Sequence, residues 1–241
     1  MANRFSNLKV AVLVTDGFEQ TQLLEPKQAL EAAGATVHVL SDKPSGVQGV
    51  MHLDKGQVVA VDNTIDQASS DDYSAVLLPG GAANGDALRL RPQARSFVHA
   101  ANIAEKPIAA ICHGGWLLIS ADLAKGRTVT SWPSLQDDFR HAGSKWVDQA
   151  VVRDRNLVSS RHPADFPAFN DEFMKLLDEQ QQRELRQPFT PAGAVGEVRA
   201  NADAIPPVKK LSSHGTAPAA PPQHEDEAFA IALGQSHQSD G

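Results

Sequence analysis

Short apolar runs alternate with helical patterns through the first 180 residues of this chain. A run of Val, Ile, Leu and Ala is typical of a buried strand, whereas apolar residues repeated every three or four positions indicate a helix. The expected strands cover residues 8–14, 37–40, 75–78, 107–111, 128–130, 151–152 and 157–158, and a run at 58–61 is an extra strand or part of a hairpin. The expected helices cover residues 21–33, 87–104, 134–142 and 168–180. Strands separated by helices predict an α/β fold in which helices cover both faces of a parallel sheet.

The pattern changes near residue 187. Seven of the 15 prolines lie between Pro188 and Pro222, among Ala, Gly and Ser residues that follow no sustained period. Such a composition buries too little apolar surface to offset the entropy lost on ordering. We therefore expect one domain at residues 1–186 and a disordered tail, rich in Pro, Ala and Gly, at residues 187–241. An apolar segment at 227–233 is either a short helix for a partner surface or a chance apolar island.

Overall charge and composition exclude several classes of protein. A net charge of −7 argues against nucleic-acid binding through a general basic surface. The single cysteine forms no internal disulfide, the first residues have no apolar signal segment, and no run reaches the roughly 20 apolar residues that span a bilayer. We therefore expect a cytoplasmic protein with no membrane partner. The sequence has no phosphate-binding loop, dinucleotide fingerprint or metal-ligand spacing, so we expect no cofactor and no metal.

The segment 109–115 (Ala-Ala-Ile-Cys-His-Gly-Gly) contains the only cysteine, Cys112. An apolar run leads into Cys112, small residues stand two positions before and after it, and a helix-compatible stretch follows. This is the pattern of a nucleophile elbow, a sharp turn from a strand into a helix. Unpaired N–H groups and the positive end of the helix dipole favour the thiolate over the thiol there. The pattern favours a reactive thiol; the alternative is that Cys112 is a small buried hydrophobe.

Two other loops are expected to meet Cys112. Glu19 and Gly81 each follow the carboxyl end of an expected strand, and such ends share one crevice in a parallel sheet. Glu19 either places a carboxyl group beside the thiol, with a pKa raised by burial and the neighbouring negative charge, or only interacts with the dipole of the helix that begins there. The N–H groups of Gly81 and His113 are the candidate oxyanion donors, although the glycines could serve the turn alone.

His113 is the leading candidate for acid–base catalysis, but adjacent residues at an elbow tend to point in different directions. A rival base is His162, which follows another expected strand end. The segment 162–165 reads His-Pro-Ala-Asp, whereas class I glutamine amidotransferases have His-Pro-Glu, so the spacing of the acid does not match. His38 and His141 are expected to be structural or solvated.

A series of motifs resembles the ThiJ/PfpI superfamily of class I glutamine amidotransferase-like proteins. The last two motifs are similar to its PfpI branch, which comprises intracellular proteases and general stress proteins. The resemblance covers residues 9–177 and implies a flavodoxin-like doubly wound parallel sheet sandwiched by helices. It also implies homodimers or larger homo-oligomers with Cys112 near a subunit interface. The motifs lie at residues 12–19, 25–26, 78–81, 110–114, 130–134 and 142–148.

The resemblance implies roles for the matching residues. Cys112 would be the nucleophile, His113 the relay, and Glu19 the carboxyl group that contacts the thiol. In PfpI-like members an acid after the Pro-Gly-Gly loop reaches the histidine from a neighbouring subunit. The matching residue is Asp86, which could instead cap the next helix. Gly115 replaces the proline that usually follows Cys-His-Gly in this branch, so the first helical turn would be less fixed.

Three functions follow as alternatives. The first is a cysteine-dependent stress-protection hydrolase or lyase of the glyoxalase or deglycase type, which acts on small reactive carbonyls or glycated groups. The second is an intracellular cysteine peptidase of PfpI type. The third is a redox sensor or stress chaperone in which Cys112 is oxidised reversibly, since the chain has no second cysteine for a disulfide. We favour an enzyme, with the carbonyl substrate ahead of the peptide.

Overall fold

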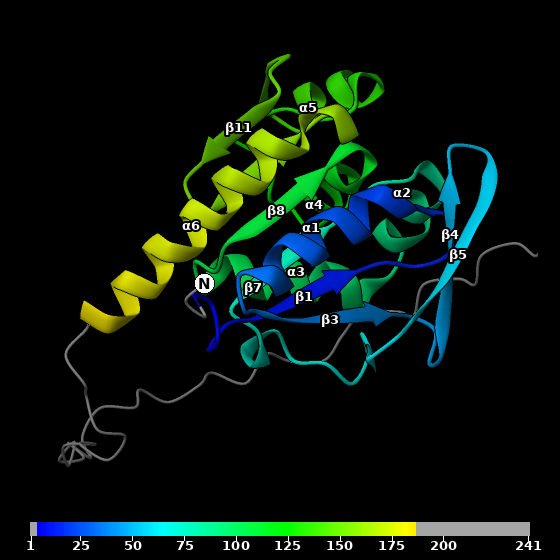
Figure 1. Ribbon diagram of the computed structural model, residues 1–241. Coiled ribbons are helices and arrows are strands. Elements are labelled where there is room, and N and C mark those ends of the chain that lie inside the picture. The colour runs from blue at the N-terminus through cyan, green and yellow to red at the C-terminus, as the bar shows by residue number, and fades with distance from the viewer. Residues whose placement is uncertain (1–3, 187–241) are drawn as a thin grey trace, which may run out of the picture. The chain divides into compact units, whose positions relative to one another are not determined.

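The computed structural model describes residues 4–186, and the predicted tail with its apolar segment lies outside the described residues. A seven-stranded sheet forms the centre of the described part (Figure 1). Neighbouring strands run parallel except β11 and β12, which form an antiparallel pair at one edge. The order is β11 (Val151–Asp154), β12 (Leu157–Ser160), β8 (Ile108–Ile111), β7 (Ala75–Leu78), β1 (Lys9–Leu13), β3 (Thr36–Ser41) and β6 (Asn63–Thr64).

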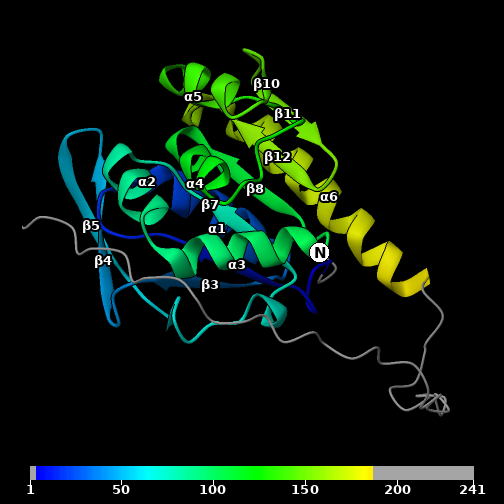
Figure 2. The same ribbon diagram turned by 180° about the vertical axis from the view of Figure 1, so that it is seen from behind.

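Helices cover both faces of the sheet, as Figures 1 and 2 show from opposite sides. One face carries α1 (Gln20–Ala32) and α6 (Phe166–Arg186). The other face carries α2 (Ala82–Arg89), α3 (Pro92–Ile103) and α4 (Gly115–Ser120). The predicted doubly wound α/β architecture is therefore confirmed.

The central strand β1 is buried on both faces. Val10 and Val12 pack into the core beneath α1 and α6, whereas Ala11 and Leu13 pack beneath α3 and α4. Successive side chains of a strand point to opposite faces, so a strand covered on both sides needs apolar residues at every position. This explains the unbroken apolar run at residues 8–14.

The expected single helix at 87–104 is wrong. The chain forms α2 and α3 instead, and Pro92 is the first residue of α3. Proline has no N–H and fixes φ, so it suits a first helical turn but disrupts a helix interior. The proline therefore divides the segment, and α2 begins directly after the Pro-Gly-Gly loop.

The run at 58–61 belongs largely to a hairpin rather than to the central sheet. β5 (Asp54–Ala60) pairs antiparallel with β4 (Gly46–Met51), and β4 also pairs with the short β2 (Phe18–Glu19). The strand β4 was not predicted from the sequence, because glycines at 46 and 49 interrupt its apolar pattern. This hairpin brings its tip to the carboxyl end of the central strands, where it borders the candidate site.

The remaining elements are short. The expected strand at 128–130 is observed as β9, which pairs with β10 outside the central sheet, and the expected helix at 134–142 is a 3-10 turn followed by α5. The bounds are β9 (Thr128–Val129), β10 (Lys145–Trp146), α5 (Gln136–His141), and the 3-10 turns η1 (Ser70–Asp72), η2 (Cys112–Gly114), η3 (Pro133–Leu135) and η4 (Pro163–Asp165).

Candidate functional site

Cys112 lies at a sharp turn between β8 and α4, as the elbow pattern predicts. Its φ is 57°, in the left-handed region that costs a non-glycine residue roughly 1–2 kcal/mol. A Cβ added at Gly114 would lie 2.2 Å from the carbonyl oxygen of Leu78, at the end of β7. The small residue two positions after the cysteine is therefore required because the turn passes directly against the neighbouring strand.

Loops after three adjacent strands meet at this turn. The loops follow β1, β7 and β8, whose carboxyl ends lie side by side in the sheet. The backbone N–H of Glu19 donates to the carbonyl of Gly80 at 3.2 Å, which joins the first loop to the second. Asn84 is fully buried and joins them again: it accepts from the Thr15 N–H at 2.7 Å and donates to the carbonyls of Pro79 and Gly80. The expected convergence of the loops is confirmed.

Gln22 is a site residue that the sequence reasoning missed. Its side chain is 2% exposed, its Oε1 accepts from the Gly80 N–H at 2.8 Å, and its amide hydrogen-bonds the Cys112 thiol. The signal in the sequence is a polar residue on the buried face of α1, beside Leu23 and Pro26. Such a residue needs a buried partner, because an unsatisfied amide in a core is costly.

His113 lies beside the thiol, with its Nδ1 3.2 Å from Cys112 Sγ. The concern that adjacent residues would point apart is therefore wrong for this pair. Two tryptophans hold the ring: the centroid of Trp116 lies 5.0 Å from it and that of Trp132 lies 6.0 Å from it. Burial lowers the pKa of His113, so the neutral ring is favoured at neutral pH.

Burial raises the pKa of the Cys112 thiol above its ordinary value, and the negative charge of Glu19 acts in the same direction. Hydrogen bonds from the Gln22 side chain and from the backbone N–H groups of His113 and Gly81 oppose this rise. On balance the pKa of the thiol lies above its ordinary value, which does not support the expected thiolate-favouring elbow. The reason is that Cys112 is only 6% exposed, and loss of hydration outweighs the favourable contacts.

A cavity of about 610 Å³ lies over the thiol. Its walls are predominantly apolar, and its volume is in the usual range of small-molecule sites. The elbow, the Pro-Gly-Gly loop and the β4–β5 hairpin all contribute to it. The lining includes Glu19, Gln22, Val50, His52, Leu53, Gly81, Cys112, His113, Trp132 and Pro163.

Glu19 connects the hairpin to the cavity. Its Oε2 accepts a hydrogen bond from the backbone N–H of His52 at 3.1 Å, and its charge affects the Cys112 thiol. Glu19 therefore lies between the tip of the hairpin and the cysteine. The hydrogen bond found for this carboxylate is therefore with the hairpin, and its expected direct contact with the thiol stays a prediction.

Two of the predicted site residues, Asp86 and His162, are not among the described residues that line this cavity. Asp86 lies on the exposed side of α2, and it caps neither α2, which begins after Gly81, nor α3, which begins after Arg91. His162 places its Nδ1 3.4 Å from Asp165 Oδ2 instead of beside the thiol. The capping alternative for Asp86 is thus wrong, and the imidazole of His162 contacts Asp165, whereas the adjacent Pro163 lines the cavity.

The absence of a side chain at Gly115 leaves space for the ring of Phe139 in the core. The φ of Gly115, −60°, is ordinary, but an added Cβ would lie 2.8 Å from Cζ of Phe139. Phe139 is 1% exposed and fills the position that a larger residue would need. The Phe139 ring of α5 fills the space that Gly115 leaves, and the expected loosening of the helix start stays a prediction.

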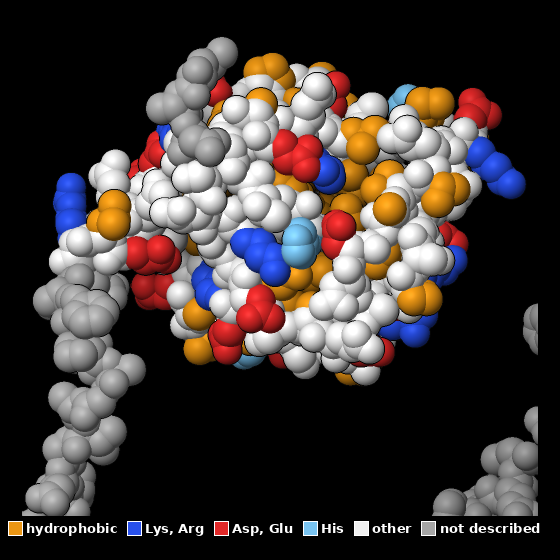
Figure 3. All heavy atoms as spheres, turned by 60° about the horizontal axis from the view of Figure 1, so that its bottom comes forward, with side chains coloured by type: hydrophobic (Ala, Val, Ile, Leu, Met, Phe, Trp, Pro, Cys, Tyr) orange, Lys and Arg blue, Asp and Glu red, His pale blue; other side chains and the backbone are white. Residues whose placement is uncertain are grey.

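The face of the molecule drawn in Figure 3 carries both positive and negative side chains. On the face in Figure 3, Lys and Arg side chains are interspersed with Asp and Glu side chains. Within residues 4–186, none of the helices combines the length and apolar character that crossing a bilayer requires.

The fold and the site define an α/β sandwich protein with a cysteine at a strand-to-helix elbow and a histidine beside it. The chain belongs to the DJ-1/PfpI family, whose model matches residues 8–176. This confirms the resemblance seen in the sequence motifs.

Proteins of known sequence and structure agree with this assignment. Deglycase PfpI of Pyrococcus furiosus is 39% identical over 170 residues, which cover 70% of this chain and 99% of the relative. YraA of Bacillus subtilis, named as a candidate cysteine protease, is 39% identical over 169 residues, covering 70% and 98%. A crystal structure of a two-domain protein from Anabaena variabilis, with DJ-1/ThiJ/PfpI-like and ferritin-like domains, matches with a TM-score of 0.67 and 32% identity. That match covers 70% of this chain and 48% of the two-domain chain.

Proposed function

We propose that this protein is a stress-protective deglycase that removes reactive carbonyl groups through Cys112. The observation that carries the proposal is the 3.2 Å contact between Cys112 Sγ and His113 Nδ1 at the wall of a predominantly apolar cavity. A relative with 39% identity over nearly its whole length is named a deglycase, which supports the same activity. A cavity of this size suits a small carbonyl adduct.

In the proposed first step, the Cys112 sulfur attacks the carbonyl carbon while its proton passes to His113 Nδ1. A sulfur–carbon bond forms and the π electron pair moves to the carbonyl oxygen. The N–H groups of Gly81 and His113 are the proposed donors to that oxygen, because both already point toward the sulfur. Burial keeps the His113 ring neutral and able to accept the proton.

The proposed carboxyl groups have different roles. Glu19 is proposed to add to the effect of burial in raising the pKa of the thiol, so that the sulfur stays protonated until attack. Asp86 is proposed to orient His113 from a second copy of the chain, which its exposed position on α2 allows. The resemblance to PfpI-like proteins is the basis of this second assignment.

The test uses the products of methylglyoxal with N-acetyl-lysine and N-acetyl-cysteine as substrates, with fluorescent casein in parallel. We expect the wild type to consume the adducts and release free amine or thiol, and Cys112→Ala to do neither. Casein cleavage without adduct loss would overturn the proposal in favour of a peptidase, the activity that the name of YraA suggests for that relative. If the wild type neither consumes the adducts nor cleaves casein, and mild peroxide adds two oxygens to Cys112, a redox sensor would be favoured.

The pH dependence of thiol reactivity tests the electrostatics of the site. Because Cys112 is the only cysteine, iodoacetamide alkylation reports its thiolate directly. Burial and Glu19 raise the pKa of this thiol, so the alkylation rate is expected to increase with pH through a midpoint above that of a solvent-exposed cysteine. Glu19→Gln removes the negative charge and is expected to shift the midpoint to lower pH.

Glu25→Gln is the matched control, because Glu25 lies on the exposed side of α1. It is expected to leave the midpoint where it is in the wild type. A midpoint that stays the same or moves upward in Glu19→Gln would show that this carboxylate does not act on the thiol.

A further inference from the structure

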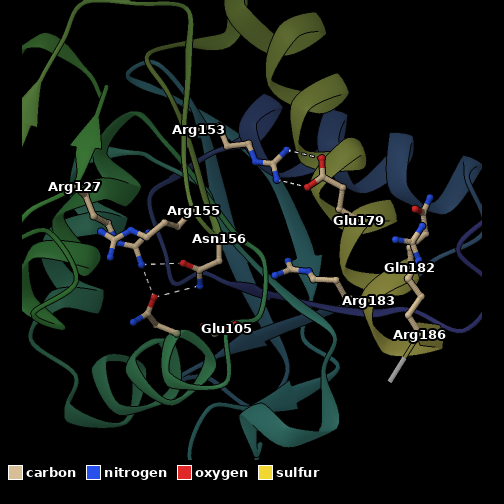
Figure 4. Close-up of a pocket in the computed structure, with 10 residues that line it drawn as sticks. Glu105, Arg127, Arg153, Arg155, Asn156, Glu179, Gln182, Arg183 and Arg186 are labelled. Atoms are coloured by element: carbon tan, nitrogen blue, oxygen red, sulfur yellow. Dashed lines mark hydrogen bonds and ion pairs between the residues drawn. The ribbon is translucent and has the colours of Figure 1, made fainter. Parts of the chain in front are cut away.

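A second cavity, of about 650 Å³, lies at the opposite end of β8 from Cys112 (Figure 4). The register places Leu157 of β12 beside Ile108, the first residue of β8, whereas Cys112 follows the last. The turn between β11 and β12, the end of α3, the residue before β9 and the last turns of α6 form its walls. None of the described residues that line the proposed catalytic cavity lines this one.

Positive charge concentrates in this second cavity. Five arginines and two glutamates line it, and two further carboxylates, Asp154 and Glu172, pair with Arg155 and Arg153, so one positive charge remains in excess in a chain whose net charge is −7. Like charges at close range repel unless a counter-ion lies among them. The arginines are Arg127, Arg153, Arg155, Arg183 and Arg186.

Arg127 is the least exposed of these arginines, with 6% of its surface accessible. Its guanidinium donates to the carbonyl oxygen of Asp154 at 2.9 Å and to the side-chain oxygens of Asn102 and Asn156 at 2.6 and 2.8 Å. All three acceptors are neutral, and within residues 4–186 no carboxylate lies within ion-pair distance of it. Burying a cation without an anionic partner is unfavourable. Burial and the nearby charge of Arg155 both lower the pKa of Arg127, and the negative charge of Asp154 opposes them only in part.

The other arginines differ in how far they are neutralised. Arg153 pairs with Glu179 and Glu172 across the cavity wall. Arg155 pairs with the adjacent Asp154 and is largely exposed at the β11–β12 turn. Figure 4 shows Arg183 extending from α6 toward Asn156, and Arg183 forms no ion pair within the described range 4–186. Arg127 and Arg183 therefore line the cavity without a carboxylate partner among residues 4–186, whereas the exposed Arg155 has one in Asp154.

We propose that this cavity binds a small molecule that carries two or more linked phosphate groups, with Arg127, Arg155 and Arg183 as its contacts. Guanidinium groups match phosphate oxygens in geometry and remain charged throughout the physiological pH range. Two linked phosphates would supply anionic partners to both Arg127 and Arg183, which line the cavity and have no carboxylate within ion-pair distance among residues 4–186. The volume accommodates inorganic pyrophosphate or the polyphosphate of a nucleotide.

Calorimetric titration of the full chain with pyrophosphate, adenosine triphosphate and adenosine tests this site. We expect both phosphate compounds to bind and adenosine not to bind. Equal affinity for the two would indicate that the phosphates alone are recognised, and tighter binding of adenosine triphosphate would indicate an organic ligand. The combined variant Arg155→Gln with Arg183→Gln is expected to bind pyrophosphate at least tenfold more weakly.

Three controls make the result specific to this cavity. Arg140→Gln removes an exposed arginine of α5 and is expected to bind like the wild type. Cys112→Ala is expected to bind like the wild type, whereas competition at the catalytic cavity would change its affinity. Because Arg155 and Arg183 are exposed, the melting temperature of the double variant is expected to be close to that of the wild type.

Pyrophosphate is also expected to raise the melting temperature of the wild type, since a ligand of the folded state stabilises it. Absence of binding at millimolar pyrophosphate, or unchanged affinity in the double variant, would overturn the proposal. Tighter binding of a single-stranded oligonucleotide than of either small phosphate would also overturn it, in favour of a nucleic-acid surface. Failure of the deglycase assay would leave this test unaffected, because the titration measures binding at a different cavity.

Discussion

Cys112→Ala is expected to lower kcat/KM for methylglyoxal adducts by roughly a thousandfold or more. The thiol is the only sulfhydryl group in the chain, and it lies at the wall of the cavity with His113 Nδ1 3.2 Å away. Removing the sulfur removes the atom that forms the covalent bond, and neither neighbouring loop offers a replacement nucleophile at that position. Release of free amine or thiol from the adducts is the measurement.

The histidines provide a matched comparison for this result. His113→Ala is expected to reduce the rate about a hundredfold, because it removes the proton acceptor but leaves the sulfur. His141→Ala changes an exposed histidine at the end of α5 and is expected to have no effect. Retention of more than a tenth of the wild-type rate in Cys112→Ala would exclude the cysteine as nucleophile, provided that the variant unfolds at the wild-type temperature.

Gly114→Ala is expected to lower the free energy of unfolding by about 3 kcal/mol. The added methyl group would lie 2.2 Å from the Leu78 carbonyl oxygen and 2.9 Å from that of Pro79. Both neighbours are backbone atoms of a central strand and its loop, so neither can move without displacing the Pro-Gly-Gly turn. The backbone at Gly114 has a φ of −57°, which alanine adopts readily, so the expected loss comes from steric overlap alone. Urea unfolding followed by circular dichroism measures it.

Gly126→Ala is the comparison that distinguishes the cost of steric overlap from the cost of backbone strain. Gly126 has a φ of 73° and nothing within 4 Å of an added Cβ, so its replacement carries conformational strain of roughly 1–2 kcal/mol without a clash. We expect Gly114→Ala to be the more destabilising of the two. The opposite order would mean that the elbow can move away from β7, which would weaken the steric account of the small residue after the cysteine.

Local patterns determined most of the secondary structure and the centre of the site. The continuous apolar run of β1 follows from burial on both faces of the sheet, and this is visible in sequence because every position is affected alike. The elbow was also predictable, since small residues, a nucleophile and the following helix lie within a few positions of one another. The proximity of Glu19 and Gly81 to Cys112 followed from the rule that parallel strands share one carboxyl edge.

The tertiary structure decided the features that depend on packing between distant segments. Gln22, Asn84 and Trp132 join the site only because α1, α2 and the segment before η3 fold against the elbow. The pKa of Cys112 rises because burial outweighs nearby hydrogen bonds, a balance that no local pattern reports. The arginine cavity likewise collects residues from the end of α3, the β11–β12 turn and α6. The sequence by itself determines local geometry and the edge of the sheet at which the loops meet. The burial of a site residue and the charge around it depend on all of its neighbours, and many of these come from distant segments. Only the folded chain brings those neighbours together.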